Sequence, residues 1–326
     1  MKADTAAVLA VTGLTIGLAD SRHAPALVDD LSFGVAEGEM LAFVGESGSG
    51  KSLTASAIFG LLPFGTRRLA GSIRLKDTEL TGLPERALRA WRGRDMGLVF
   101  QNPLTALSPS VGVQAQIAET YRVHKGGTRR AARERAQGLL KEVGLPVRAD
   151  GIDTYPHQLS GGMRQRAMIA LALACDPALL IADEPTTALD VLIQAQILDL
   201  LARLQKERGL AVVLITHDLT LAARYADRIL VLYAGRAVEE GRADRFFRGP
   251  RHPYSRALRD AIPKIPATGE RLAEIPGLPP GPDALAAGCS FAPRCPNARD
   301  DCRQSEPPMR LSGTRFACLH PCPETP

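Results

Sequence analysis

The sequence has no apolar run of the ~18 to 20 residues that a membrane-spanning helix requires. The two best candidates, residues 167–175 and 210–215, have the length of buried core segments. Residues 6–19 are partly apolar, but threonines and glycines interrupt them and a single lysine precedes them. This pattern predicts a first β-strand instead of a signal peptide. We therefore expect a chain that neither crosses a membrane nor is exported.

Aromatic residues are also scarce, at 5% of the chain. The arginine-rich segments 67–68, 86–94 and 129–135 lack an accompanying pattern of aromatic side chains on which nucleic-acid bases could stack. We interpret these segments as solvated helix faces and expect no nucleic-acid partner. The net charge of +5 suits an acidic ligand, a membrane surface or nucleic acid, so charge alone assigns no function.

The sequence contains no internal repeat, and each functional motif occurs once. A single copy implies that the chain contributes one half of any assembly with two equivalent sites. A chain of 326 residues can bury one large core with a small appendage, or two modest domains. From about residue 8 to residue 248, short apolar strands alternate with helical stretches, which is typical of an α/β fold with a largely parallel sheet. The clearest predicted strands are residues 40–44, 96–100, 179–182, 211–216 and 229–233.

Two segments interrupt this alternation. Between residues 103 and 175 the strand pattern lapses, and arginine-rich helical stretches such as 128–143 predict a helical subdomain inserted into the sheet domain. After Arg248, frequent prolines preclude long helices and interior strands. We therefore predict one large domain over residues 1–248 and a separate, irregular extension over residues 249–326.

A glycine-rich loop lies between the predicted strand 40–44 and the helical stretch 53–62, which is the context of a phosphate-binding P-loop. Its glycines let backbone N–H groups approach a phosphate, and the helix N-terminus adds a positive dipole. Lys51 is expected to contact the β- and γ-phosphates of ATP, and Ser52 to bind Mg²⁺. The predicted nucleotide-binding residues are Gly45, Glu46, Ser47, Gly48, Ser49, Gly50, Lys51 and Ser52.

A pair of carboxylates ends another predicted strand, residues 179–182. Asp183 is expected to hold Mg²⁺ through water, which leaves Glu184 to position or deprotonate the attacking water. Carboxylates at a strand end are usually a solvated cap. A preceding P-loop makes the catalytic interpretation the favoured one.

The segment 159–166, Leu-Ser-Gly-Gly-Met-Arg-Gln-Arg, leads into a helical stretch and resembles the signature motif of the ABC ATPases. In isolation, Ser160 would be interpreted as a helix N-cap followed by the glycines of a turn. The resemblance implies instead that Ser160, Gly161 and Gly162 of one subunit cap the ATP that the P-loop of a second subunit holds. The start of a helix also suits an anion.

Other positions match the same family in order and spacing. The resemblance implies that Gln101 binds Mg²⁺ and senses the nucleophilic water, that residues 188–190 are the D-loop, and that His217 is the switch histidine. Asp190 of the D-loop is then a nucleotide-site residue, and Gln101, Glu184 and His217 take the catalytic roles. The implied fold is a P-loop NTPase, RecA-like core with an ABC-type helical subdomain.

One element departs from the family pattern. ABC ATPases usually stack an aromatic ring on adenine, and only Arg22 or His23 is available in the corresponding region. Adenine recognition is therefore left without an assigned residue.

Three further segments, residues 100–109, 233–241 and 252–255, are similar to the oligopeptide and dipeptide importer ATPases, to which nickel importer subunits are related. This resemblance covers nearly the whole chain. It implies a peripheral subunit at the cytoplasmic face of the inner membrane. Its partners are a second, often non-identical ATPase, two permease subunits and an extracytoplasmic substrate-binding protein. The rival interpretations are a soluble ABC ATPase and a metal-binding regulatory module with an incidental ATPase.

Five of the six cysteines lie after residue 288, and reduced cytosolic thiols favour a metal site over disulfides. The candidate ligands are Cys289, Cys295, Cys302 and Cys318, which suffice for tetrahedral zinc or an iron–sulfur cluster. The importer resemblance includes this tail and implies a [4Fe-4S] cluster, with zinc and free thiols as alternatives. Cys322 and His320 are spare candidate ligands, and Cys175 is expected to be a buried apolar residue.

Overall fold

The computed structural model describes residues 7–19, 26–102, 106–147, 153–187, 189–262, 274–281 and 288–323. The contacts within the chain divide it into two compact units. Unit 1 comprises residues 1–9, 35–40 and 75–214, and unit 2 comprises residues 10–34, 41–74 and 215–326. Both units combine helices with strands, so the chain is an α/β protein, as predicted.

The principal sheet of unit 2 has the strand order β11-β12-β10-β9-β3. Its strands are β3 (Met40–Val44), β9 (Arg228–Tyr233), β10 (Arg236–Arg242), β11 (Arg310–Ser312) and β12 (Thr314–Phe316). Strands β3 and β9 are parallel, whereas β9 and β10 form an antiparallel hairpin. Ala234 and Gly235 both have positive φ, as a tight two-residue hairpin turn requires.

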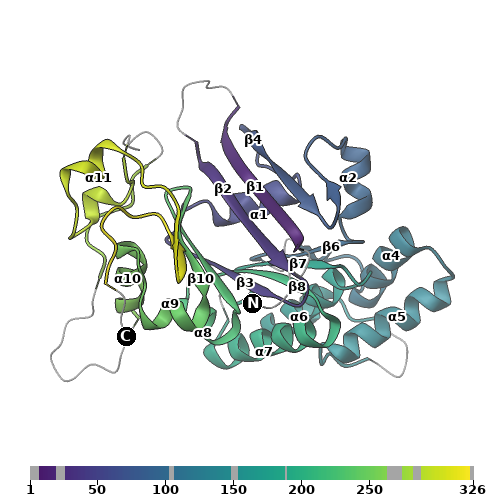
Figure 1. Ribbon diagram of the computed structural model, residues 1–326. Coiled ribbons are helices and arrows are strands. Elements are labelled where there is room, and N and C mark those ends of the chain that lie inside the picture. The colour runs from purple at the N-terminus through teal and green to yellow at the C-terminus, as the bar shows by residue number, and fades with distance from the viewer. Residues whose placement is uncertain are drawn as a thin grey trace. The chain divides into compact units, whose positions relative to one another are not determined.

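The C-terminal tail extends this sheet at one edge. Strand β12 pairs antiparallel with β10, and β11 pairs with β12, as the yellow strands in Figure 1 show. The sequence pattern predicts no interior strand after Arg248, yet β12 lies between two other strands. The difference arises because residues 310–316 contain no proline and turn tightly at Gly313, which has a φ of +72°.

The helices of the tail are short, as its proline content predicts. They are α10 (Pro253–Asp260), the 3₁₀ turn η3 (Ala292–Arg294) and α11 (Asp300–Gln304), and α9 (Ala243–Arg248) precedes them. Unit 2 also contains α1 (Lys51–Ile58), α8 (Leu219–Tyr225) and most residues of the strands β1 (Ala7–Leu18), β2 (Val28–Ala36) and β4 (Thr66–Leu75), in the order β2-β1-β4.

An aromatic cluster forms part of the core of unit 2. Tyr233 of β9, Tyr254 of α10 and Phe291 of the tail are each no more than 1% exposed. The Tyr233 ring centroid lies 4.5 Å from that of Tyr254 and 5.2 Å from that of Phe291. Burial of each large aromatic side chain contributes roughly 1.5–3 kcal/mol. The cluster therefore attaches the tail firmly to the sheet.

Unit 1 contains the parallel pair β6 and β7 in the strand order β8-β7-β6. Its elements are β5 (Thr78–Glu79), α2 (Glu85–Trp91), β6 (Met96–Val99), α4 (Val113–Lys125), α5 (Arg129–Glu142), η1 (Pro156–Gln158), α6 (Gly161–Ala172), β7 (Leu179–Asp183), α7 (Val191–Arg208) and β8 (Ala211–Ile215). Figure 1 shows α4 and α5 packed side by side as a helical hairpin. Thr128 caps α5 by accepting a hydrogen bond from the N–H of Ala131.

The predicted strands are present in the structure, with ends that differ by one residue at most. Each consists almost wholly of buried apolar residues, which is why an unbroken hydrophobic run identifies it in the sequence. From residue 106 to residue 172, the described residues form helices and turns without a named strand, as the helical subdomain prediction requires. Among the helices that the structure describes, none has the length and hydropathy needed to cross a bilayer.

Candidate functional site

The glycine-rich loop connects the buried strand β3 to helix α1. Gly45 and Gly50 have positive φ values of 154° and 96°, which L side chains rarely adopt. A Cβ atom at Gly45 would lie 2.2 Å from the carbonyl oxygen of Leu232, and one at Gly50 would lie 2.9 Å from a methyl carbon of Val28. The loop therefore requires glycine at both positions for steric reasons as well as for its backbone conformation.

Lys51 is buried at the start of α1, with 6% of the residue exposed. Its ammonium group donates to the carbonyl oxygens of Gly45 and Glu46, at 2.7 and 2.9 Å, and to Ser49 Oγ at 3.2 Å. These contacts hold the positive charge against the loop. Ser47, Gly48 and Ser52 are exposed beside it.

Glu46 of the loop makes two contacts that no sequence pattern predicts. Its carboxylate accepts two hydrogen bonds from the guanidinium of Arg294, at 2.6 and 3.0 Å. Its backbone N–H donates to the hydroxyl of Tyr254 at 2.9 Å. Both partners belong to the C-terminal tail within unit 2. The His-Pro-Tyr segment signals Tyr254 in the sequence, but no pattern marks Arg294.

The predicted catalytic carboxylate is in unit 1, just after β7. Glu184 has a left-handed φ of +46°, which costs a non-glycine residue about 1 kcal/mol or more. One carboxylate oxygen accepts hydrogen bonds from Gln101 Nε2 and from Thr187 Oγ1, both at 2.9 Å. The structure thus brings Gln101 and Glu184 together, because they follow the neighbouring parallel strands β6 and β7. Asp183 is the last residue of β7.

The signature segment forms the N-terminus of α6. Ser160 is its N-cap, and the Ser160 side chain accepts a hydrogen bond from the N–H of Met163 at 3.3 Å. A Cβ atom at Gly162 would lie 2.7 Å from a methyl carbon of Ile193, so α6 begins in close contact with α7. Asp190 caps α7 by accepting from the N–H of Ile193 at 2.9 Å. The signature glycines and Asp190 therefore lie in one region of unit 1.

Three further predictions concern residues at the edges of these elements. His217 is exposed in unit 2, one residue after Thr216, whose N–H donates to the carbonyl of Phe43 in β3 at 3.1 Å. Ala188 of the D-loop and the two candidate adenine contacts, Arg22 and His23, lie outside the described residues.

The four predicted cysteine ligands line a single cavity in unit 2. Cys289, Cys295, Cys302 and Cys318 share it with His252, Phe291 and His320. Burial raises the pKa of the Cys289 and Cys295 thiols, and it raises the pKa of Cys318 to about 12. Without a bound metal, these three thiols therefore stay protonated at neutral pH.

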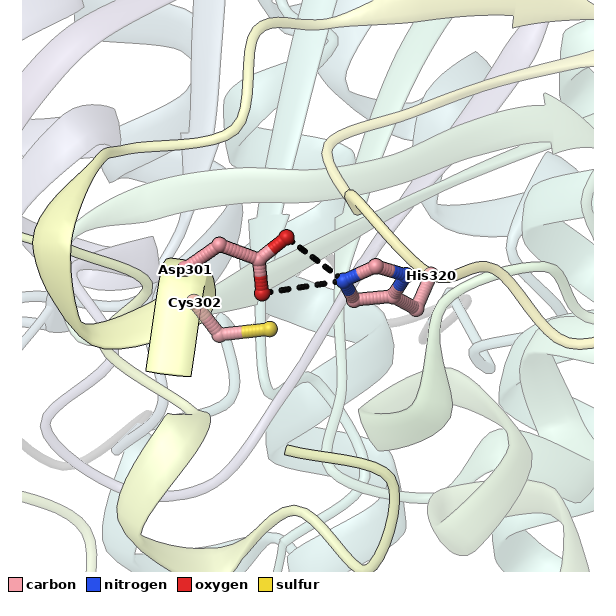
Figure 2. A group of neighbouring side chains, drawn as sticks. All are labelled: Asp301, Cys302 and His320. Carbon is pink, nitrogen blue, oxygen red and sulfur yellow. Dashed lines mark hydrogen bonds and ion pairs between the residues drawn. The ribbon is translucent and has the colours of Figure 1, made fainter. Parts of the chain in front are cut away.

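The two additional candidate metal ligands, His320 and Cys322, lie in different surroundings. Figure 2 shows Asp301, Cys302 and His320, whose ligand atoms all lie within 4.8 Å of one another. His320 Nε2 lies 2.7 and 3.0 Å from the two Asp301 carboxylate oxygens, and this hydrogen bonding lowers the pKa of Asp301. Cys322 is buried where its N–H donates to the Arg251 carbonyl at 2.8 Å. Cys175 is fully buried, as expected.

Comparison with protein families gives two matches along the chain. Residues 28–187 match the family described as ABC transporter. Residues 238–302 match the oligopeptide/dipeptide transporter C-terminal region.

Similar proteins match along nearly their whole lengths. The dipeptide transport ATP-binding protein DppD of Haemophilus influenzae is 48% identical over 96% of this chain and 95% of its own. Its namesake in Escherichia coli is 46% identical over 97% of each chain. A putative peptide import ATP-binding protein of Brucella abortus is 46% identical over 97% of this chain and 96% of its own.

Solved structures agree with these matches. A dimeric ATP-binding cassette in a post-hydrolysis state, bound to ADP and Pi, matches with a TM-score of 0.63 and 28% identity over 72% of this chain and 98% of its own. The ABC transporter component cbiO1 of Clostridium perfringens matches with a TM-score of 0.64 and 28% identity over 74% of this chain and 90% of its own. The fold is therefore that of an ABC ATPase built on a P-loop core, and the chain belongs to the ATP-binding subunits of the oligopeptide/dipeptide ABC transporter family.

Proposed function

We propose that this chain binds and hydrolyses ATP with Mg²⁺ at the cytoplasmic face of the inner membrane and thereby powers peptide uptake through separate permease subunits. Glu184 carries the proposal, because its carboxylate is held by Gln101 and Thr187 at the end of the strand that also bears Asp183. The peptide cargo is inferred from relatives whose names specify dipeptide transport and peptide import.

Each predicted site residue has a proposed role in this reaction. Lys51 neutralises the β- and γ-phosphates, while Ser52, Asp183 and Gln101 bind Mg²⁺ directly or through water. Glu184 positions or deprotonates the attacking water, and His217 contacts the γ-phosphate. The remaining loop residues donate backbone N–H groups to the phosphates.

We infer that hydrolysis requires a second ATPase subunit. In the proposed arrangement, Ser160, Gly161 and Gly162 contact the ATP held by the P-loop of the other subunit. Asp190 lies beside them at this interface between the two ATPase subunits. The helix N-terminus at Ser160 supports this role, because it presents N–H groups and a positive dipole to a phosphate. ATP binding then draws the subunits together, and hydrolysis releases them.

The remaining partners follow from the same family. We propose two permease subunits, whose coupling helices dock beside residues 101–107, and an extracytoplasmic binding protein that delivers the peptide. Residues 103–105 of this docking segment lie outside the described residues. A domain boundary near residue 248, with residues 249–326 as the importer-type extension, stays a prediction.

Transport by the reconstituted assembly tests the cargo. Vesicles that contain this subunit with its copurified permease, second ATPase and binding protein should accumulate dipeptides or oligopeptides in an ATP-dependent way. Nickel uptake without peptide uptake would show that the subunit serves a nickel importer. ATP hydrolysis by a chain that copurifies with no integral membrane protein would instead favour a soluble ABC ATPase.

We also propose that the four cysteines hold a [4Fe-4S] cluster, with zinc as the alternative. The residues fit such a group, because all four thiols line one cavity and are at least partly buried. A bound cluster would cross-link the tail through four iron–thiolate bonds and so stabilise it. The gaps between these cysteines are wider than the spacing of most zinc fingers, and the resemblance to the peptide importers implies the cluster.

Metal analysis of anaerobically purified protein distinguishes these states. We expect about four iron atoms per chain and a brown absorption band, both lost in Cys295→Ser because one thiolate ligand is removed. Cys175→Ala is the matched control. Cys175 is buried and lies outside the cavity, so this variant should retain the iron. Stoichiometric zinc without iron would establish the zinc site, and absence of both metals would leave free thiols.

A further inference from the structure

Arg294 of the cysteine-rich tail is held almost wholly out of solvent. It ends the 3₁₀ turn η3 and directly precedes Cys295. Its side chain is 5% exposed, and both terminal nitrogens donate to the two carboxylate oxygens of Glu46, which is 28% exposed. A bidentate guanidinium–carboxylate pair of this kind fixes orientation as well as distance. The pair joins two residues that are 248 positions apart in the sequence.

The other contacts of Arg294 leave it little freedom. Its Nε donates to the carbonyl of Pro276 at 2.8 Å, and its terminal nitrogens also reach the carbonyl of Ile275 and the hydroxyl of Tyr233, each at 3.3 Å. The guanidinium carbon lies 5.8 Å from the Tyr233 ring centroid and 6.0 Å from that of Phe291. Arg294 is therefore pre-organised by the tail and the sheet to receive the Glu46 carboxylate.

Tyr254 makes a second contact with the same loop residue. Its hydroxyl oxygen accepts the backbone N–H of Glu46 at 2.9 Å. Tyr254 is fully buried, and its own N–H donates to His252 Nδ1 at 3.1 Å. The N–H groups of Arg251 and His252 in turn donate to the buried carboxylate of Glu239, each at 2.8 Å. The start of α10 is thus anchored to β10, and it presents the Tyr254 hydroxyl to the loop.

Glu46 connects these tail residues to the phosphate-binding lysine. Its carbonyl oxygen accepts a hydrogen bond from Lys51 Nζ at 2.9 Å. Its side chain, N–H and carbonyl are therefore bound to Arg294, Tyr254 and Lys51 respectively. A displacement of the tail would shift the peptide units on both sides of Glu46 and with them the position of the Lys51 ammonium.

We propose that the C-terminal extension positions the nucleotide-binding loop, with Arg294 and Tyr254 as positioning residues that act on ATP through Glu46. The inference rests on the proposed binding of ATP at this loop. It assigns the tail a part in nucleotide affinity. Because Arg294 lies between Cys289 and Cys295, the segment that contributes two of the four clustered thiols is also the segment that holds the loop.

Two conservative variants of the full-length protein, copurified with its partners, test the proposal. Tyr254→Phe removes only the hydroxyl, and we expect it to raise the Kd for Mg·ATP about 2- to 10-fold, since one neutral hydrogen bond is lost. Arg294→Lys keeps the charge but loses the fork geometry, and we expect an increase of about tenfold. In the double variant the two effects should be less than additive, because both act on Glu46.

Measuring ATP affinity and turnover separately distinguishes a positioning effect on the loop from a loss of folding. Calorimetric Kd values for Mg·ATP, kcat and KM should show a loss of affinity that exceeds the loss of kcat, with iron content unchanged. Arg130→Lys is the matched control, because Arg130 forms an exposed ion pair with Glu134 and is 89% exposed. It should bind ATP as the native chain does.

The alternative is that the tail merely packs on the sheet. Lower melting temperatures with unchanged Kd values in Tyr254→Phe and Arg294→Lys would overturn the inference. The same titration of Lys51→Ala distinguishes failure of the positioning role from failure of the proposed ATP site. If Lys51→Ala abolishes binding while the tail variants do not, only the positioning role fails, and if it also binds normally, the proposed ATP site itself fails.

Discussion

Replacing Glu184 by glutamine is expected to lower the rate of ATP hydrolysis by about 100-fold or more, because a general base contributes roughly 10²- to 10⁴-fold. The amide is nearly isosteric, so it can keep the contacts that Gln101 and Thr187 make with the Glu184 side chain. Binding of Mg·ATP should therefore persist in the Glu184→Gln variant. Phosphate release and nucleotide titration on the copurified assembly measure the two properties separately.

The same variant should accumulate the ATP-bound, closed pair of ATPase subunits, since closure no longer leads to hydrolysis. Light scattering with and without Mg·ATP detects the pair. Glu207→Gln provides a control, because Glu207 forms an exposed helical ion pair with Arg203 and should leave the rate unchanged. ATP turnover at the native rate in Glu184→Gln would rule out the catalytic role of this carboxylate.

Replacing Lys51 by alanine is expected to weaken Mg·ATP binding by about 100-fold or more, because a charged donor that neutralises the phosphates is lost. The substitution also leaves the carbonyls of Gly45 and Glu46 without the donor that joins them. The loop should lose its shape as well as its charge. Calorimetric titration with Mg·ATP measures the loss of affinity.

A melting curve of the Lys51→Ala variant shows whether the domain remains folded. Lys206→Ala is the matched control, since Lys206 is exposed on α7 and its removal should change neither affinity nor stability. Native affinity for ATP in the Lys51→Ala variant would place the nucleotide elsewhere on the chain.

The strands and the conformation of the glycine-rich loop could be predicted because their determinants are local. A strand such as β3 is buried over its whole length, and so appears as five consecutive apolar residues between polar segments. Gly45 and Gly50 occupy positive φ values that exclude other residues, so the glycine pattern itself reports the loop conformation. The order of the short motifs then indicated the family.

The course of the tail was harder to predict, because proline content describes only local conformation. The prolines correctly predicted short helices, but strand β12 depends on pairing with β10, which lies about seventy residues earlier in the chain. Backbone pairing between distant segments leaves little mark on a single sequence.

By itself, the sequence determined the α/β class and the buried strands, because an apolar run and a glycine-rich loop depend on neighbouring residues alone. It also predicted which residues have chemical roles. Only the tertiary structure decided which of those residues meet. Gln101 reaches Glu184 across 83 positions, and Arg294 reaches Glu46 across 248. The physical reason is that such contacts depend on how elements pack in space, and spacing along the chain does not record that packing.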